Sequence, residues 1–246
     1  MVTAASRSMT APDQPAGSSS CRHALVTGAS SGIGAAVAMR LLADGWTVTG
    51  LSRSEPAIRA SGFTHRPLDL AVADALTIRS TLDRLRPVDA LVHAAGLLRV
   101  GTLGALDREA GTAMWRLHVE AASLLADAVA PGMTAGGRIV LLGSRVAAGA
   151  AGRSQYAATK AALVGLARSW AIELAPRGIT VNVVAPGATE TPMLLDPKRA
   201  QSPPRRPPIG RFIQPTEIAA LVAFLLSPEA GAITGQQIVV CGGASL

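Results

Sequence analysis

A tyrosine and a lysine four residues apart are the residues of this sequence best suited to acid–base chemistry. Tyr156 is the only tyrosine in the 246-residue chain, and Lys160 is one of two lysines among 23 basic residues. On a helix, a spacing of four places both side chains on one face. An ammonium group beside a phenol favours the phenolate, so it lowers the tyrosine pKa toward working pH. The pair predicts an acid–base centre, although a solvated helix face would show the same spacing.

A glycine-rich segment near the N-terminus has the composition of a phosphate-binding turn. Residues 27–34 read Thr-Gly-Ala-Ser-Ser-Gly-Ile-Gly, between a short apolar run and a helical pattern that continues to Leu42. Glycines let the backbone turn tightly and approach a pyrophosphate, whose charge is met by free N–H groups at the helix start. An ordinary tight turn has the same glycines, but this position between strand and helix favours a nucleotide site.

The elements that must position these groups alternate along the chain. Strands are predicted at 23–26, 46–51, 63–68, 90–93, 138–142, 180–184 and 237–240. After the first helix, amphipathic patterns predict helices near 72–86, 106–130, 154–175 and 215–227. This alternation predicts an α/β fold with a seven-stranded parallel sheet flanked by helices. Ligands bind such sheets at the carboxyl ends of the strands.

Composition indicates a single globular body. Hydrophobic residues make up 49% of the chain and charged residues 16%, which excludes a disordered protein. Residues 1–20 are expected to form a disordered tail without the apolar core of a signal peptide, and residues 21–246 a single domain. No apolar run approaches the ~20 residues that a membrane span needs. Cys21 and Cys241 suggest no disulfide framework, so we expect a cytoplasmic protein with no membrane partner.

The net charge of +7 raises the question of a nucleic-acid partner. The one basic cluster consists of Lys198, Arg199, Arg205, Arg206 and Arg211. It lies in a Pro-rich stretch without aromatic residues among the charges, so stacking on bases has little support. We expect no nucleic-acid partner and no metal site, and an anionic small molecule fits the charge better.

The motifs, in their order along residues 22–243, resemble the short-chain dehydrogenase/reductase family. Residues 27–34 resemble its Thr-Gly-x-x-x-Gly-x-Gly motif, residues 94–96 the end of its Asn-Asn-Ala-Gly motif, and residues 156–160 its Tyr-x-x-x-Lys motif. Ser144 matches the active-site serine twelve residues before the tyrosine, and Asn182 precedes a Pro-Gly segment as in the family. The resemblance implies a doubly wound Rossmann-type domain.

The resemblance also implies roles for these residues. In carbonyl reduction Tyr156 donates a proton while hydride arrives from a nicotinamide, Lys160 holds the ribose and lowers the tyrosine pKa, and Ser144 bonds the substrate oxygen. Taken alone, Ser144 is as well explained as a polar residue that ends a strand. The residues implied to contact the cofactor are Gly28, Ser30, Ser31, Gly32, Ile33, Gly34, Ser52, Arg53, Asp69, Leu70, Ala94, Ala95, Gly96, Tyr156, Lys160, Pro186, Gly187, Thr189 and Thr191.

Three departures from the family pattern put parts of it in doubt. His93 and Ala94 replace two asparagines, and Cys241, interpreted as a small buried hydrophobe, replaces a common aspartate. His118 stands where the family usually has an asparagine that anchors a proton-relay water. A neutral imidazole donates with one nitrogen and accepts with the other, so His118 is a candidate catalytic residue. A helix histidine with no chemical part remains the alternative.

Cofactor choice depends on the end of the second strand. Ser52 occupies the position where an acidic residue would bind the adenosine ribose and repel a 2′-phosphate, and Arg53 follows it. A hydroxyl and a guanidinium both bond a phosphate, so NADP (NADPH) is predicted, with NAD as the alternative. Ser31 weakens this prediction because many NADP-preferring relatives carry a second basic residue in the glycine turn.

The substrate is the least determined feature. A 3-oxoacyl-type reductase is favoured, and a dihydrodiol dehydrogenase acting on an aromatic acid is the alternative. In the family the stretch after Thr191 closes over the substrate, and arginines there are compatible with an acidic or carrier-bound one. Two alternatives lie outside the enzyme class: a catalytically silent NADP-sensing protein and a structural or interaction protein. The helices near 106–130 and 154–175 form the tetramer interface in many relatives, so a homotetramer is expected.

Overall fold

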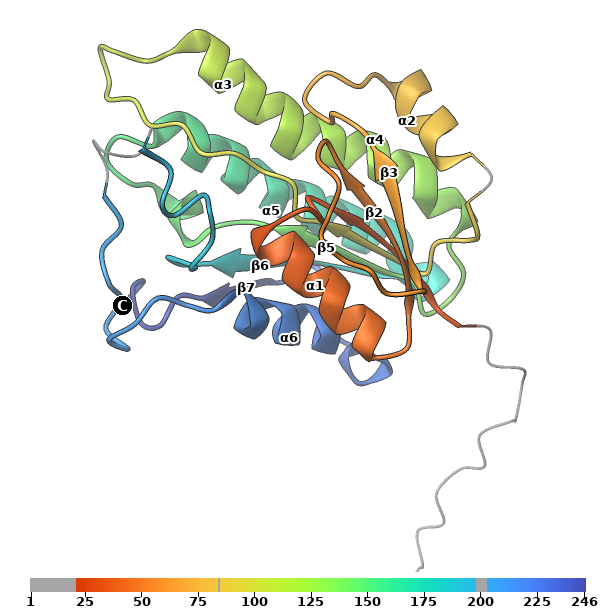
Figure 1. Cartoon of the computed structure of the whole chain (residues 1–246). Helices are drawn as coiled ribbons and strands as arrows, with labels where there is room; N and C mark the ends of the chain where they lie inside the picture. Colours follow the sequence, from red (N-terminus) through yellow and green to blue (C-terminus); the bar gives the residue numbers. More distant parts are fainter. Residues whose placement is uncertain (1–20, 84, 198–202) are drawn as a thin grey trace, which may run out of the picture.

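A computed structural model describes residues 21–83, 85–197 and 203–246 of the chain (Figure 1). The predicted tail, residues 1–20, lies outside the described residues, as do Lys198 and Arg199 of the basic cluster. Among the described residues no helix combines the length and apolar character needed to cross a bilayer.

Seven parallel strands form one sheet in the order β3-β2-β1-β4-β5-β6-β7, which confirms the predicted fold class. The strands are β1 (His23–Thr27), β2 (Thr47–Ser52), β3 (Phe63–Pro67), β4 (Ala90–His93), β5 (Arg138–Leu142), β6 (Thr180–Pro186) and β7 (Gln237–Val240). The direction of strand addition reverses between β1 and β4, where the chains that follow both strands diverge and leave a crevice.

Helices cover both faces of this sheet (Figure 1). They are α1 (Gly32–Ala43), α2 (Ala75–Leu82), α3 (Arg108–Trp115), α4 (Ala121–Val129), α5 (Ser154–Leu174) and α6 (Pro215–Leu225). Short helical turns are η1 (Arg116–Glu120), η2 (Ala130–Gly132), η3 (Arg145–Ala148), η4 (Ala175–Arg177) and η6 (Pro228–Ala230). Helices α1 and α6 pack together on one face, and α4 and α5 cover the other.

Alternation along the strands supplies two separate cores, one on each face. On β1, Ala24 and Val26 join the cluster under α1 and α6, whereas Leu25 joins the cluster under α4 and α5. All three side chains are fully buried. A parallel strand buried on both faces needs apolar residues at nearly every position. The central strands therefore appear in the sequence as nearly continuous apolar runs.

The predicted helix near 106–130 is not one regular helix. It consists of α3, the π-helical turn η1 and α4 in direct succession. Side-chain periodicity differs little between these helix types over five residues, so the sequence pattern does not reveal the extra residue in the turn. The π turn contains His118, which it directs into the protein interior.

Candidate active site

The glycine turn between β1 and α1 is too tightly packed to hold side chains at two of its glycines. Gly28 has a φ of +67°, and a Cβ there would lie 3.0 Å from the Ala95 Cα. A Cβ on Gly34 would overlap the carbonyl oxygen of Gly28. Within the described part of the chain, Ser31 precedes α1 without a side-chain capping bond. The first N–H groups of α1 are therefore available to an anion, and the turn fits the pyrophosphate of a dinucleotide.

A cavity of about 250 Å³ extends from this turn along the ends of β2 and β4. Fourteen of the predicted cofactor residues line it: Gly28, Ser30, Ser31, Gly32, Ile33, Gly34, Ser52, Arg53, Asp69, Leu70, Ala94, Ala95, Gly96 and Thr191. We call this space the nucleotide cavity. Most of its lining comes from the segments that follow β1, β2, β3, β4 and β6, so the fold brings together residues up to 165 positions apart (Gly28 to Met193).

Ser52 is already bonded to protein groups in the nucleotide cavity. Its hydroxyl donates to the carbonyl of Ser54 at 2.8 Å and lies 3.1 Å from His65 Nε2. Arg53 is exposed at the edge of the cavity. Of the two residues predicted to bind a 2′-phosphate, Arg53 is therefore the exposed one, whereas the Ser52 hydroxyl is already bonded within the protein. His65 was missed by sequence reasoning because a histidine on an edge strand carries no motif.

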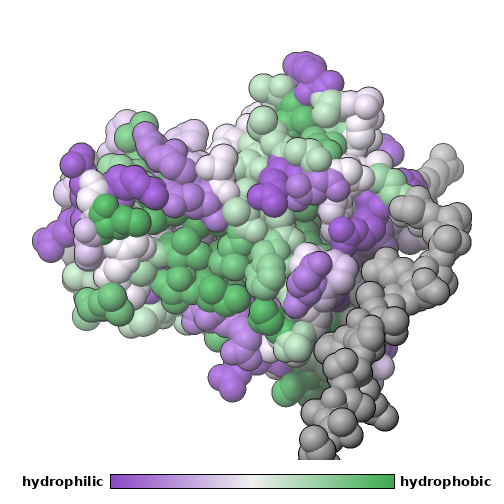
Figure 2. Space-filling model, turned by 90° about the horizontal axis from the view of Figure 1, so that it is seen from below, coloured by the Kyte–Doolittle hydropathy of each residue, from purple (hydrophilic) through white to green (hydrophobic). Residues whose placement is uncertain are grey.

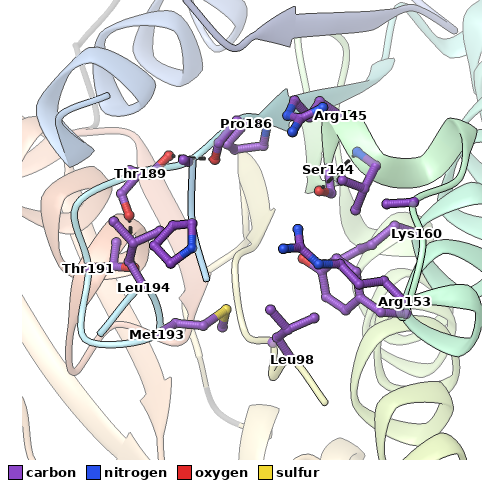
Figure 3. A pocket seen from close by; sticks show the side chains of 18 of the residues that line it. Leu98, Ser144, Arg145, Arg153, Lys160, Pro186, Thr189, Thr191, Met193 and Leu194 are labelled. Carbon is purple, nitrogen blue, oxygen red and sulfur yellow. Dashed lines mark hydrogen bonds between the residues drawn. The ribbon is translucent and has the colours of Figure 1, made fainter. Parts of the chain in front are cut away.

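A second cavity, of about 580 Å³, adjoins the first and contains the predicted catalytic residues (Figure 3). We call it the substrate cavity. Ser144, Tyr156 and Lys160 line it, as do Pro186 and the nicotinamide-side residues Gly187, Thr189 and Thr191. Five residues, including Gly96 and Thr191, line both cavities. One extended ligand can therefore run from the glycine turn to Tyr156.

Lys160 is held beside Tyr156 by the helix and by a strand carbonyl. Its Nζ lies 5.8 Å from the centre of the Tyr156 ring and donates to the carbonyl of Leu142, at the end of β5, at 2.7 Å. The side chain is buried, and burial lowers the pKa of Lys160 to about 7. The predicted juxtaposition of the two side chains on α5 is therefore present.

Ser144 follows β5 and begins η3. Its side chain accepts a hydrogen bond from the N–H of Val146 at 3.3 Å, which orients the hydroxyl toward the cavity where Figure 3 shows it. The Ser144 oxygen is the acceptor in this bond, so its hydroxyl can still donate to a substrate oxygen.

His118 is buried against the same site, and its contacts fix its tautomer. Its Nε2 accepts from the N–H of Leu97 at 3.0 Å, and its Nδ1 lies 2.8 Å from the Thr159 hydroxyl, which itself donates to the carbonyl of Tyr156. The proton therefore sits on Nδ1. Burial, followed by the charge of Lys160, holds the pKa of His118 well below its usual value. Both nitrogens bond protein groups rather than the predicted relay water.

His93 is a second buried histidine with a fixed tautomer. Its Nε2 donates to the carbonyl of Leu117 in η1 at 3.0 Å, and its Nδ1 accepts from the Thr27 hydroxyl at 3.1 Å. Thr27 in turn accepts from the N–H groups of Ala94 and Ala95. Burial and the charge of Lys160 lower the pKa of His93 to about 3. His93 thus ties the ends of β1 and β4 to the π turn that carries His118.

Asn182 and Cys241, two further residues compared with the family pattern, are both buried. Asn182 lies on β6, where it donates to the carbonyl of Ile233 at 2.7 Å and accepts from the N–H of Gln236; among the described residues it lines neither cavity. It therefore links β6 to the chain that leads into β7. Cys241 is buried, as predicted. Burial raises the pKa of its thiol, while hydrogen bonds from Ser245 and neighbouring N–H groups lower it to a net value below the usual one.

Comparisons with known proteins agree with this geometry. A family model described as enoyl-(acyl carrier protein) reductase matches residues 28–245. The 3-oxoacyl-[acyl-carrier-protein] reductase FabG of Escherichia coli is 42% identical over 234 residues, which cover 89% of this chain and 96% of the relative. A short-chain dehydrogenase from Burkholderia cenocepacia, solved with NADP, superimposes with a TM-score of 0.82 at 38% identity, covering 92% and 98% of the two chains. The chain belongs to the short-chain dehydrogenase/reductase family.

Membership of the short-chain dehydrogenase/reductase family confirms the predicted enzyme class, an oxidoreductase that interconverts a carbonyl and a secondary alcohol with a nicotinamide cofactor. A further relative is the (2S)-[(R)-hydroxy(phenyl)methyl]succinyl-CoA dehydrogenase subunit BbsD of Thauera aromatica, 37% identical over 92% of this chain and 97% of the relative. The family is thus shared by relatives named for different substrates.

Sequence reasoning missed two residues of the substrate cavity in this short-chain dehydrogenase/reductase. Arg145 follows Ser144, and Arg153 lies three residues before Tyr156; both line the cavity. Their only signal in the sequence is closeness to the catalytic residues, which does not show the direction of a side chain.

Proposed function

We propose that the protein reduces the ketone of a 3-oxoacyl compound to a secondary alcohol at the expense of NADPH. The observation that carries this proposal is the gathering of Ser144, Tyr156 and Lys160 in a cavity that adjoins the glycine turn. The names of the FabG relatives support the 3-oxoacyl substrate class. The complex of the Burkholderia cenocepacia relative with NADP supports the cofactor, in agreement with the prediction from Arg53.

The residues of the substrate cavity suit this reduction. The Tyr156 hydroxyl donates its proton to the carbonyl oxygen as negative charge develops there, and the Ser144 hydroxyl donates a hydrogen bond to the same oxygen. The positive charge of Lys160 stabilises the phenolate that Tyr156 leaves behind. When bound, the reduced nicotinamide supplies the hydride to the carbonyl carbon. The products are the alcohol and the oxidised cofactor, and the Tyr156 phenolate takes up a proton from solvent to restore the starting enzyme.

His118 serves in this proposal as a positioning residue. It connects the segment after β4, through Leu97, to α5, through Thr159 and the Tyr156 carbonyl. Its ring edge also meets the Tyr156 ring, with centroids 5.6 Å apart. The imidazole thus holds the tyrosine relative to the chain segment that lines both cavities. His118 therefore affects catalysis by positioning Tyr156 and does not itself contact the substrate.

The test of the proposed function is NADPH oxidation driven by a neutral 3-oxobutanoyl thioester of N-acetylcysteamine. The wild-type protein is expected to consume NADPH only when the ketone is present and to yield the 3-hydroxy product. A protein that binds NADPH but reduces neither this thioester nor the ketoester ethyl 3-oxobutanoate would contradict the proposal. A silent sensor would behave in that way.

We also propose a homotetramer, supported by two separate apolar surfaces. On the α3 and α5 side, Leu106 and Trp115 are 42% and 49% exposed beside a hollow between the two helices. On the α6 side, where Figure 2 shows hydrophobic side chains gathered across the face, Phe224 and Val239 are each 45% exposed. Two self-complementary surfaces are what a tetramer built as a dimer of dimers requires. Light scattering that gave the monomer mass would contradict this.

Domain organisation and location complete the proposal. We propose that residues 21–246 form a single domain, because the described elements share one sheet with an apolar core on each face. A cytoplasmic location is supported by the two cysteines, which are not joined: Cys21 is exposed and Cys241 is buried. Limited proteolysis that cut stably between residues 21 and 246 would contradict the single domain.

A further inference from the structure

The walls of the substrate cavity carry charge of one sign. Among the described residues that line it, Arg145, Arg153, Lys160 and Arg205 are basic and none is acidic. The chain as a whole has 16 acidic residues against 23 basic ones. A cavity with basic groups and no acid raises the local concentration of anions and strengthens their binding. The asymmetry therefore belongs to this cavity and not merely to the basic composition of the protein.

The phosphates of a dinucleotide do not account for this charge. The glycine turn and Arg53 line the nucleotide cavity, and among its described lining residues none of the four basic groups of the substrate cavity occurs. Lys160 has a place in the proposed chemistry. The arginines have no place in that chemistry, and Arg153 is the arginine nearest to the reacting tyrosine in sequence.

Arg153 is directed at the reacting centre. It immediately precedes α5, and Figure 3 shows its side chain reaching into the middle of the cavity between Ser144 and Leu98. Burial, followed by the charge of Arg145, lowers the pKa of Arg153, and Tyr156 acts in the opposite direction. Arg145 is braced by a hydrogen bond from its Nη1 to the carbonyl of Ala244 at 3.2 Å.

Apolar side chains also form part of the cavity wall. Leu98, Val146, Met193, Leu194 and Pro204 line the cavity around the arginines. A ligand that fits both features has an apolar body and an anionic group close to the reacting carbon. Guanidinium binds carboxylate through two parallel hydrogen bonds, a geometry that an ammonium group does not offer.

We propose that Arg153 binds a carboxylate that the substrate carries within a few bonds of its reacting carbonyl, with Arg145 adding positive charge to the same cavity. The substrate class is then a keto acid, of which a 3-oxo acid is the simplest form compatible with the proposed function, on which this inference rests. Arg153 is a specificity-determining residue in this scheme. It selects the charged acid over a neutral ester of the same acyl group.

The test compares one acyl group in two charge states. For 3-oxobutanoate and ethyl 3-oxobutanoate, kcat/KM is measured in the wild type and in Arg153→Gln, Arg153→Lys and Arg59→Gln. Loss of a charged hydrogen-bonded pair predicts a fall of about 10- to 100-fold for the acid in Arg153→Gln. The ratio of kcat/KM for the acid to kcat/KM for the ester is therefore expected to fall by about 10-fold or more, because the ester makes no charged bond to Arg153. Arg153→Lys should restore part of the activity on the acid. Arg59, an exposed arginine outside both cavities, should change neither.

Calorimetry gives a second readout that needs no turnover. The NADP-loaded wild type is titrated with 3-oxobutanoate and with the ester, and only the acid is expected to lose affinity in Arg153→Gln. Equal losses on acid and ester would overturn the proposal, because Arg153 would then act on Tyr156. No loss on either, or a wild type that binds the acid no more tightly than the ester, would overturn it as well. If the proposed function itself is wrong, the wild type will reduce neither the acid nor the ester. That result differs from the outcomes that overturn only the role of Arg153.

Discussion

The nucleotide cavity and the substrate cavity adjoin each other but are built in different ways. The first is made by the backbone: Gly28 and Gly34 leave no room for side chains, and the start of α1 offers N–H groups. The second is made by side chains from separate segments, with Ser144 after β5 and Tyr156 and Lys160 on α5. Backbone geometry recognises a phosphate whatever the substrate, whereas side chains decide which chemistry follows. Changes at one end should therefore leave the function of the other largely intact.

The largest effect is expected from removing the acid at the substrate end. Tyr156→Phe deletes the proton donor and keeps the ring, so kcat should fall by about 10³- to 10⁴-fold, as for loss of a general acid. The dissociation constant of NADPH should change by less than about threefold, because the phosphates are bound elsewhere. Steady-state kinetics and calorimetry give the two numbers. A comparable loss of NADPH affinity would show that the two cavities do not act separately.

The next effect is expected at the glycine turn. In Gly34→Ala the new methyl overlaps the Gly28 carbonyl, so the turn must shift away from the phosphates. Affinity for NADPH and NADH should fall together by about 100-fold, equivalent to two charged hydrogen bonds. Gly132→Ala is the matched control, since a Cβ there has nothing within 4 Å among the described residues. Fluorescence titration measures both affinities, and unchanged binding in Gly34→Ala would refute the assignment of the turn.

A smaller and more selective effect is expected from Arg53. Arg53→Ala removes the exposed guanidinium at the edge of the nucleotide cavity, so NADPH affinity should fall by about 10- to 100-fold. NADH affinity should stay constant, because NADH has no 2′-phosphate. Arg53→Lys should recover part of the loss, and Arg59→Ala should cause none. If the wild type prefers NADH, the prediction of NADP is wrong.

The smallest effect is expected from His118, which acts through Tyr156. His118→Ala removes the links to Leu97 and Thr159 and should lower kcat about tenfold, less than the roughly 10²- to 10⁴-fold that complete loss of a general acid costs. His118→Asn keeps one donor and one acceptor and should retain turnover. The pH–rate profile separates positioning from simple destabilisation, because a misplaced Tyr156 moves its apparent pKa. A fully active alanine variant would leave His118 without a part in the mechanism.

The sheet and the glycine turn could be predicted from the sequence for a physical reason. Buried parallel strands such as β5 require apolar residues throughout, and glycines are required where a Cβ would collide, as at Gly34. Each of these demands leaves a residue-type signal. The spacing of Tyr156 and Lys160 on α5 is a signal of the same kind, because a helix fixes the distance between them.

The features that were missed depend on contacts between distant segments. The π turn η1 has nearly the periodicity of an α-helix, and it is secured by His93 from β4 rather than by its own sequence. The direction of Arg153 depends on the packing of the cavity wall, and the hydrogen-bond partners of Asn182, Ile233 and Gln236, follow more than 50 residues later in the chain. Such positions become visible only when the chain is folded.

A double-mutant cycle tests the separation of the two cavities most directly. Arg53→Ala, Tyr156→Phe and the double variant are compared with the wild type by their NADPH dissociation constants and their kcat values for 3-oxobutanoate ester reduction. Independent sites are additive to within about 0.5 kcal/mol. The prediction is that Arg53→Ala raises the NADPH dissociation constant by the same factor in the wild type and in Tyr156→Phe. Tyr156→Phe should likewise lower kcat by the same factor in the wild type and in Arg53→Ala. A factor that depends on the background by more than about threefold would contradict the division of the site into a phosphate-binding end and a chemical end.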